Sequence, residues 1–422
     1  MKSFVLRGNL CDCSSVDAVR IRERAWLVCE DGLCSGVFDV LPERYRNLPV
    51  TDFGDALILP GLADLHVHAP QFSFRGLGMD MELLDWLERY TFPEESKYAD
   101  AEYAARAYDQ FVGALRRSFT TRVVAFGTIH RGATELLMRL LDESGLAAYV
   151  GKVNMDRNCP ETLREDTVVS LETTEAWVCE TRERFANVKP ILTPRFAPSC
   201  TPELLDGLGR LARKYALPVQ SHLSENFGEI AWVKELFPDS GFYGEVYDRF
   251  GLFGGDTPCI MAHCVHSGEA ERALMRSNGV FVAHSPLSNS NLASGAAPVS
   301  AYLAEGLHVG ISSDVAGGET ENLFAALAGA IRASKLRWRL YDESVRPLTV
   351  DQALYMATRG GGAFFGKVGA FEPGYELDAI VLDDTALVHP QPLSVRSRLE
   401  RCLYLADDRQ LVAKYVRGLR LF

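Results

Sequence analysis

The sequence predicts an α/β protein with a (β/α)8 (TIM) barrel at its centre and a small β domain built from both ends of the chain. Three observations predict this fold. From Leu57 onward, apolar runs alternate with segments of helical periodicity, which is typical of a parallel sheet covered by helices. Eight such runs fall within roughly 250 residues, the usual size of this barrel. Strand-like sequence also precedes the first run and follows the last one.

Residues 1–60 have the pattern of short strands and turns, and we expect them to form the first part of the β domain. The strand-like runs are KSFVLRG, RAWLVCEDGLCSGV and ALILP. Within the second run, Asp31-Gly32 separates two apolar stretches. An Asp-Gly pair in that position predicts a tight hairpin.

Residues 61–367 form the predicted barrel. Helical periodicity lies between its strands, for example in ELLDGLGRLARKYA and EAERALMRS. Residues 368–422 return to strand-like sequence in GYELDAIVLDD and LVAKYVRGLRLF, so we expect the two chain ends to pair in one β domain. The eight barrel strands are expected in DLHVHA, RVVAFGTI, AAYVGKVNM, KPILTPRFAP, PVQSHLSE, CIMAHCVH, VFVAHSP and HVGISSD.

Charge and composition exclude several classes of partner. The 422 residues carry 44 Lys and Arg against 56 Asp and Glu, a net charge of −12, which argues against a nucleic-acid partner. The start, MKSFVLRGNLCDCSS, lacks the apolar core of a signal peptide, and no run reaches the roughly 18 apolar residues that a membrane span needs. We therefore expect a cytoplasmic protein with neither nucleic acid nor membrane as partner.

The ten cysteines are scattered and do not resemble a disulfide framework. The four cysteines nearest the N-terminus could be proposed as the ligands of a zinc site. Their C-x-C and C-x4-C spacing in strand-like sequence favours buried or surface free thiols instead. These four are Cys11, Cys13, Cys29 and Cys34.

The first chemical signal is His66-Val67-His68 in an apolar run. Side chains two apart on a strand point to the same face, roughly 7 Å apart, where they can share one metal ion. Taken alone, the pair fits a hydrogen-bonded core better. Further polar residues then follow other strand-like runs, where barrel active sites lie, and as a set they favour a metal-dependent hydrolase. They are His222 with Glu225, His263, His284 and Asp314.

With these residues in view, the chain resembles the amidohydrolase superfamily over nearly its whole length. The shared motifs are PGLADLHVHA, SHLSE, MAHCVH, AHSPLSNSNLASG, SSDVAGG and FEPGYELDAIVLD. A narrower resemblance to the guanine deaminase family rests on QFSFRG, LLDWLERYTFPEE, GKVNMD and TPRFAPSC. It implies zinc-dependent hydrolysis of guanine to xanthine and ammonia, and it suggests a homodimer.

The resemblance also implies a role for particular residues. His66, His68, His222 and Asp314 correspond to the ligands of one zinc ion per chain, which Fe²⁺ or another divalent ion could replace. Asp314 would also accept the proton of the attacking water, Glu225 would carry protons to the substrate, and His263 would polarise the reacting centre or orient the water. Gln71, Arg195 and Phe196 are associated with holding the purine.

Each assignment has an alternative that the sequence leaves open. Arg195 could form a salt bridge at the barrel rim, Phe196 could pack in the core, and Glu225 could be an acid in the first turn of a helix. For His284 we favour a structural or supporting role over metal ligation. Lys152, after the strand AAYVG, could suggest a carboxylated lysine that bridges two metals. The resemblance implies that such a lysine lies on the fourth strand, and here Lys189 opens that strand instead of closing it, which favours one metal.

The remaining histidines are expected to be structural, with His266 a candidate neighbour of the site. The others are His130, His308 and His389.

At the level of function, the alternatives are a deaminase or hydrolase of another amino-heterocycle, such as an oxidised guanine, a pterin or a triazine, and a non-catalytic scaffold on the same barrel.

Overall fold

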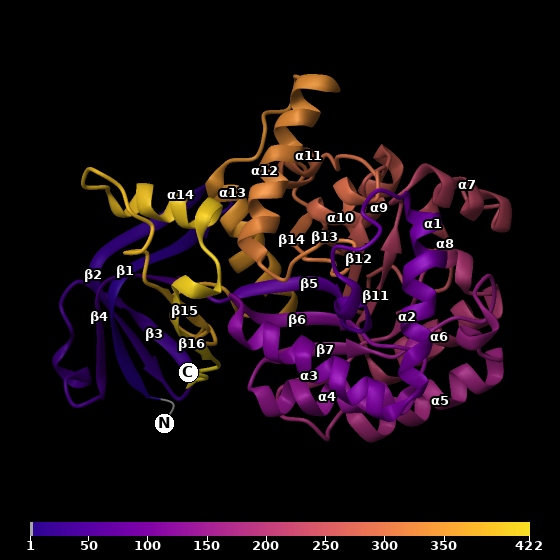
Figure 1. The fold of residues 1–422 in the computed structure, drawn as a ribbon, viewed down its shortest axis with the longest axis horizontal. Coiled ribbons are helices and arrows are strands. Elements are labelled where there is room, and N and C mark those ends of the chain that lie inside the picture. Colours follow the sequence, from indigo (N-terminus) through magenta and orange to yellow (C-terminus); the bar gives the residue numbers. More distant parts are fainter. Residues whose placement is uncertain (1–2) are drawn as a thin grey trace.

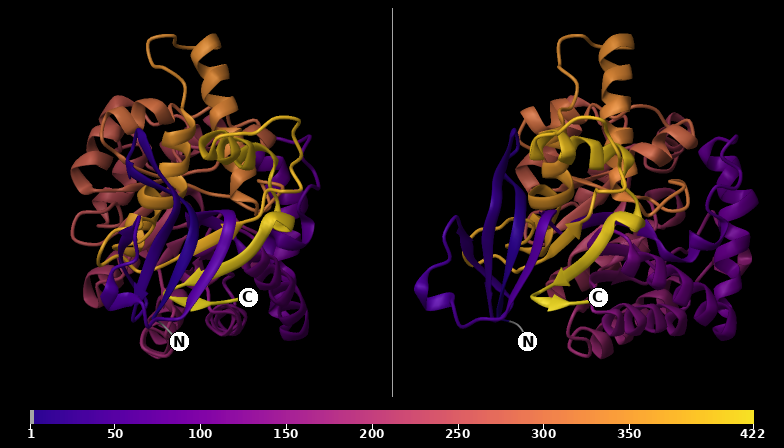
Figure 2. Two further views of the ribbon diagram at one scale, coloured as in Figure 1. Left: turned by 90° about the vertical axis from the view of Figure 1, so that its left-hand side faces the viewer. Right: turned by 60° about the vertical axis from the view of Figure 1, so that its left-hand side comes forward.

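The computed structural model describes residues 3–422 and places both ends of the chain in one seven-stranded sheet, ordered β17-β16-β15-β4-β1-β2-β3. Figures 1 and 2 show this sheet to one side of the remaining strands and helices. The pairing of β15 with β4, in which Ile380 lies opposite Leu59, joins the two chain ends as the sequence predicts. The strands are β1 (Phe4–Ser15), β2 (Ala18–Glu30), β3 (Leu33–Phe38), β4 (Val50–Pro60), β15 (Ala379–Leu382), β16 (Leu411–Val416) and β17 (Leu419–Arg420).

The predicted Asp31-Gly32 hairpin is confirmed. The two residues join β2 to β3 and have φ angles of 51° and 86°. Positive φ at both central positions is what a two-residue turn between right-twisted strands requires, and Asp and Gly tolerate it.

Eight parallel strands form two four-stranded sheets, ordered β5-β6-β7-β9 and β11-β12-β13-β14. Backbone hydrogen bonds join the two sheets at both edges, through Gln220 N to Leu192 O (2.9 Å) and Asp314 N to His66 O (3.0 Å). The strands are β5 (Leu62–His68), β6 (Thr120–Phe126), β7 (Ala147–Gly151), β9 (Val188–Pro190), β11 (Val219–Leu223), β12 (Cys259–His263), β13 (Phe281–His284) and β14 (His308–Ile311). A short parallel pair, β8 (Val153–Asn154) and β10 (Thr193–Pro194), extends β7 and β9. The fold is therefore α/β and resembles a TIM barrel, with every expected strand present.

Helices α3 to α11 lie between these strands, α12 and α13 follow β14, and α14 lies between β15 and β16; Figures 1 and 2 show helices around the parallel strands. Helix α6 shows why they form, since the Thr201 side chain caps its first turn, Pro202 begins it, and its buried leucines recur at helical spacing. The helices are α3 (Ala101–Arg117), α4 (Arg131–Ser144), α5 (Thr167–Thr181), α6 (Pro202–Tyr215), α7 (Phe227–Leu236), α8 (Tyr243–Arg249), α9 (Glu269–Asn278), α10 (Pro286–Asn291), α11 (Val299–Ala304), α12 (Leu323–Leu340), α13 (Val350–Tyr355) and α14 (Val395–Leu405). Among residues 3–422, no helix combines the length and apolar character needed to cross a membrane.

The long connection between β5 and α3 has structure of its own that the sequence analysis did not anticipate. It contains the short helices α1 (Leu83–Trp86) and α2 (Phe92–Ser96), linked by a π-helical turn at Leu87–Thr91. Leu83, Trp86 and Leu87 line the cavity described below, so this connection forms one of its walls.

Candidate metal centre and active site

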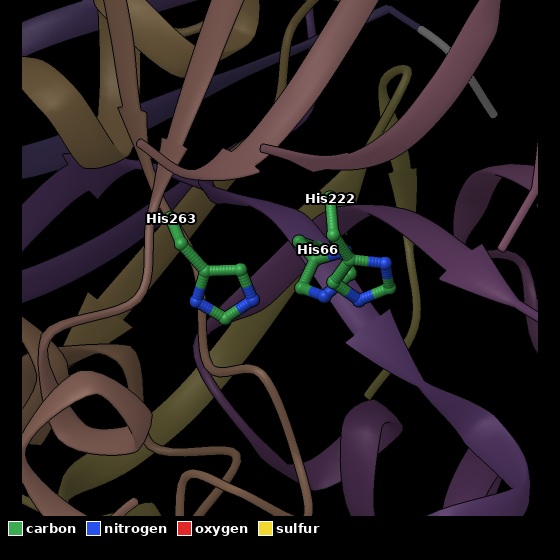
Figure 3. Close-up of side chains that lie close together, drawn as sticks. All are labelled: His66, His222 and His263. Atoms are coloured by element: carbon green, nitrogen blue, oxygen red, sulfur yellow. The ribbon is translucent and has the colours of Figure 1, made fainter. Parts of the chain in front are cut away.

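Strand ends bring the predicted polar residues together. His66 and His68 lie on β5, His222 on β11 and His263 at the end of β12, and Asp314 follows β14. All five side chains are buried. Figure 3 shows the rings of His66, His222 and His263 gathered in one place, and the centroids of His66 and His222 are 4.9 Å apart.

Donor atoms of the four predicted ligands converge. His68 Nε2 lies 3.1 Å from His222 Nε2, and the Asp314 Oδ1 atom lies 3.1 Å from His66 Nε2 and 3.6 Å from His68 Nε2. Ligands about 2.0 Å from a tetrahedral ion are about 3.3 Å from one another. This spacing fits a single metal ion held by His66, His68 and Asp314, with His222 next to His68; His222 also forms a second close group of donor atoms with His66 and His263.

The protonation states also fit a metal site. Burial lowers the pKa of His66, and it lowers the pKa of His68 and His222 well below the usual value, so the imidazoles are neutral. Burial raises the pKa of Asp314, but His66 and His263 outweigh it and lower that pKa to about 2. Neutral imidazole and ionised carboxylate are the forms that bind metals.

His263 is oriented from both of its ring nitrogens. Its Nδ1 lies 2.8 Å from Asn289 Oδ1, an acceptor, so Nδ1 donates the hydrogen bond. Its Nε2 lies 3.4 Å from Glu225 Oε2 and 3.6 Å from Asp314 Oδ2. Burial lowers the pKa of His263, and the two carboxylates more than reverse this effect and raise it. A nitrogen of His263 also lies close enough to those of His66 and His222 for the three to hold an ion.

Glu225 is buried at the start of the connection to α7. Burial raises its pKa to about 7, which suits a group that exchanges protons near neutral pH. Ser294 Oγ donates to its Oε1 (2.9 Å), and the carboxylate of Glu229 accepts from its backbone N–H (3.0 Å). Because Asn226 caps the helix that follows, Glu225 precedes the first turn of the helix and is not part of it.

Left-handed backbone conformations cluster at these strand ends. Ser224, His263 and Asp314 have φ angles of 47°, 71° and 46°. Residues with a side chain rarely adopt such angles, and the strain is tolerated where it sets a functional geometry. The left-handed backbone therefore occurs at His263 and Asp314, whose side chains line the site.

A cavity opens onto these groups and is lined by both polar and apolar side chains. Gln71, Arg195 and Phe196, which the family resemblance associates with the purine, all line it. The Arg195 Nη1 atom donates to Glu95 Oε2 (2.6 Å), so the salt bridge considered for Arg195 exists, but it is buried beside the cavity. The full lining is His68, Gln71, Leu83, Trp86, Leu87, Arg195, Phe196, His222, Glu225, Glu229, His263, Ser288, Leu292, Asp314 and Gly317.

Two other histidines lie near the site without joining the donor cluster. His284 ends β13, and burial lowers its pKa to about 3, with His263 adding to the effect. His266 Nε2 lies 2.8 Å from Ser294 O, and its ring stacks on Phe227. His266 therefore contacts the residue that binds Glu225, which agrees with its expected place beside the site.

The lysines considered for a second metal are engaged elsewhere. Lys152 Nζ is buried and donates to Glu165 Oε1 (2.7 Å), whereas Lys189 Nζ donates to Arg182 O (3.0 Å) at the surface.

Cys11 and Cys13 are also buried, and burial raises the pKa of each to about 12. Such thiols behave as apolar core groups.

Sequence reasoning missed several residues of the site. Glu95 lies in a segment that was singled out only by resemblance, Asn289 in AHSPLSNSN had no assigned role, and Trp86 belongs to the unanticipated wall. The adjacent acids Glu94 and Glu95 in FPEES, next to aromatic residues, are the one sequence signal from which Glu95 could have been found, since the structure buries both.

The chain matches the amidohydrolase family over residues 57–419. The guanine deaminase of Dictyostelium discoideum is 37% identical to it over 377 residues, covering 87% of this chain and 83% of that protein. The guanine deaminase of Escherichia coli K12 is 35% identical over 392 residues, covering 90% and 85%. Among solved structures, guanine deaminase from C. acetobutylicum with guanine bound in its active site is 47% identical, has a TM-score of 0.97, and is matched over 100% of both chains.

Proposed function

Because this chain belongs to the amidohydrolase family and, within it, to the guanine deaminases, we propose that it hydrolyses guanine to xanthine and ammonia. The observation that carries the proposal is the convergence of three imidazoles and Asp314 beside a cavity lined by Gln71 and Arg195. One water is consumed, its oxygen replaces the exocyclic amine at C2, and the amine leaves as ammonia.

His66, His68, His222 and Asp314 are the residues proposed to hold one divalent ion. Zinc fits this set of nitrogen and oxygen donors, and Fe²⁺ or another divalent ion can bind the same set. When bound, the ion lowers the pKa of water towards about 7 and stabilises negative charge on the reacting oxygen. The spacing of 3.1–3.6 Å between donor atoms supports this assignment.

Three side chains move and position protons in the proposed reaction. Asp314 accepts a proton from the attacking water. Glu225, whose pKa of about 7 leaves it protonated in part of the population at neutral pH, protonates the ring nitrogen next to C2. It then takes the proton of the hydroxyl group added at C2 and delivers it to the departing amine, and the proton held by Asp314 restores its acid form. His263, oriented by Asn289, directs its Nε2 towards both carboxylates and polarises the reacting centre or orients the attacking water.

The purine is proposed to bind between Arg195 and Gln71. The Arg195 guanidinium donates to the C6 carbonyl oxygen, and the Gln71 amide pairs with the edge of the base. The buried ring of Phe196, beside Trp232, either stacks on the purine or shapes the wall. Leu83, Trp86 and Leu87 provide an apolar cover that excludes water from the reaction.

Several features of the wider molecule belong to the same proposal. The eight parallel strands are inferred to form a closed (β/α)8 barrel over residues 61–367, with residues 1–60 and 368–422 forming the β domain. The hydrogen bonds at both edges of the two sheets support closure. We also infer a cytoplasmic location, which rests on the scattered cysteines and the lack of a signal-peptide pattern in the sequence. The inference of a homodimer rests on the resemblance alone, and light scattering of the purified protein tests it.

A substrate panel with metal quantification tests the proposal. The purified protein should contain one divalent ion per chain and convert guanine to xanthine with release of ammonia. If guanine is unchanged while a pterin, a triazine or an oxidised guanine is hydrolysed, the substrate assignment is wrong. A folded protein that is metal-free and unaffected by chelators would instead be a scaffold.

A further inference from the structure

We propose that Glu95 is a positioning residue that sets the selectivity of the cavity for a heterocycle bearing an oxo group opposite Arg195. The inference rests on the proposed function and adds a residue to it. Glu95 lies on α2, in the connection that forms the wall of the cavity, and it is buried at 1% exposure. It does not itself line the cavity.

Glu95 binds two cavity residues at once, one with each oxygen. Its Oε1 accepts from Gln71 Nε2 at 2.9 Å, and its Oε2 accepts from Arg195 Nη1 at 2.6 Å. Gln71 and Glu95 lie in the single connection between β5 and α3, whereas Arg195 follows β10. The carboxylate therefore couples two separate loops at one edge of the cavity.

This contact fixes which way the Gln71 amide faces. Its Nε2 donates to Glu95, while its Oε1 accepts from the backbone N–H of Ala316 at 3.3 Å. A flipped amide would place oxygen against carboxylate and NH₂ against N–H, so both contacts would be lost. The remaining donor and acceptor positions of Gln71 are thus set before a ligand binds.

Glu95 also fixes the Arg195 guanidinium. Within residues 3–422, it is the only hydrogen-bond acceptor of the Arg195 side chain, which is buried and lines the cavity. One corner of the planar guanidinium is held, so its other N–H groups keep a constant direction. Donors held in this way favour a ligand with an acceptor oxygen and disfavour one that leaves them unpaired.

The Glu95→Gln variant tests the proposal because it preserves size and removes one acceptor. An amide has one oxygen and one NH₂, so it can accept from Gln71 or from Arg195 but must present a donor to the other. Hypoxanthine and purine serve as probes, because they share the bicyclic ring and differ in the C6 oxygen and the proton at N1. Their dissociation constants are measured by calorimetry, which does not depend on turnover.

Wild-type protein should bind hypoxanthine more tightly than purine. The measured ratio is the dissociation constant of purine divided by that of hypoxanthine. Glu95→Gln should reduce this ratio about tenfold or more, as expected for a lost hydrogen bond to a charged group. Glu94→Gln is the matched control, since Glu94 is the preceding residue and binds Lys97 and Tyr103 instead. It should keep the wild-type ratio.

An unchanged ratio in Glu95→Gln, or equal weakening of both probes, would overturn the proposal, because equal weakening indicates a structural role only. If that variant does not fold, Glu95→Asp is measured. It keeps the charge but retracts both acceptors by one methylene, so it should give an intermediate ratio, and a wild-type ratio would also refute the role. Failure of wild-type protein to hydrolyse guanine refutes the proposed function separately, since the ratio is a binding measurement.

Discussion

Replacing Glu225 with Gln separates proton transfer from metal binding. The substitution is nearly isosteric, and an amide oxygen can still accept from Ser294 Oγ, which lies 2.9 Å from the carboxylate. The amide cannot deliver a proton, so the variant loses the acid that the mechanism uses at both the ring nitrogen and the leaving amine. Loss of general acid–base help costs about 10²–10⁴-fold in rate, which corresponds to about 2.7–5.4 kcal/mol in the activation barrier.

We expect Glu225→Gln to lower kcat by at least about a hundredfold while keeping one metal ion per chain. The assay is steady-state xanthine formation, with the metal quantified in the same samples. Glu271→Gln is the control, because Glu271 is a buried carboxylate that contacts Ser224 and Gly244 and does not line the cavity. Turnover of Glu225→Gln within tenfold of wild type would show that another group supplies the proton.

Three further predictions concern the metal, stability and pH. His68→Ala should lower the metal content of purified protein well below one ion per chain, as measured by elemental analysis, and a full complement would remove His68 from the ligand set. Arg122→Met should lower the free energy of unfolding in urea by about 3–5 kcal/mol, because it leaves the carboxylate of Asp378 buried without the partner at 2.6 Å. An equally large loss in Arg139→Met, which breaks an exposed pair, would contradict that reasoning. Burial raises the pKa of Glu271 above its ordinary value of 4.5, so its contribution to stability is present at low pH and is lost as pH rises above that value. Stability of Glu271→Gln relative to wild type should therefore increase from pH 5 to pH 8, and a constant difference would contradict the shift.

The strands could be predicted because apolar runs bounded by polar residues are local signals. The Asp31-Gly32 hairpin follows from two residues, and every expected strand is present. His66 and His68 were recognisable because a strand puts alternate side chains on one face. Their convergence with Asp314, 246 residues further along the chain than His68, was predicted from the shared rim of parallel strands and from resemblance.

The rest of the site depends on contacts that no local pattern encodes. Glu95 binds Arg195, which lies 100 residues further along the chain, and Asn289 on α10 binds His263 at the end of β12. Hydrogen-bond partners of this kind are fixed only when the loops after the strands are placed. The wall around Trp86 was missed for a related reason, since its short helices and π-helical turn lack a sustained period.

The most direct test of the central claim is guanine turnover measured against the number of zinc ions per chain. Protein stripped with a chelator is titrated with zinc while xanthine formation is followed. Activity should be absent at the start, rise in proportion to added zinc, and stop rising at one ion per chain. Turnover of the stripped protein at the full rate, or a fully loaded protein that leaves guanine intact, would contradict a one-metal guanine deaminase.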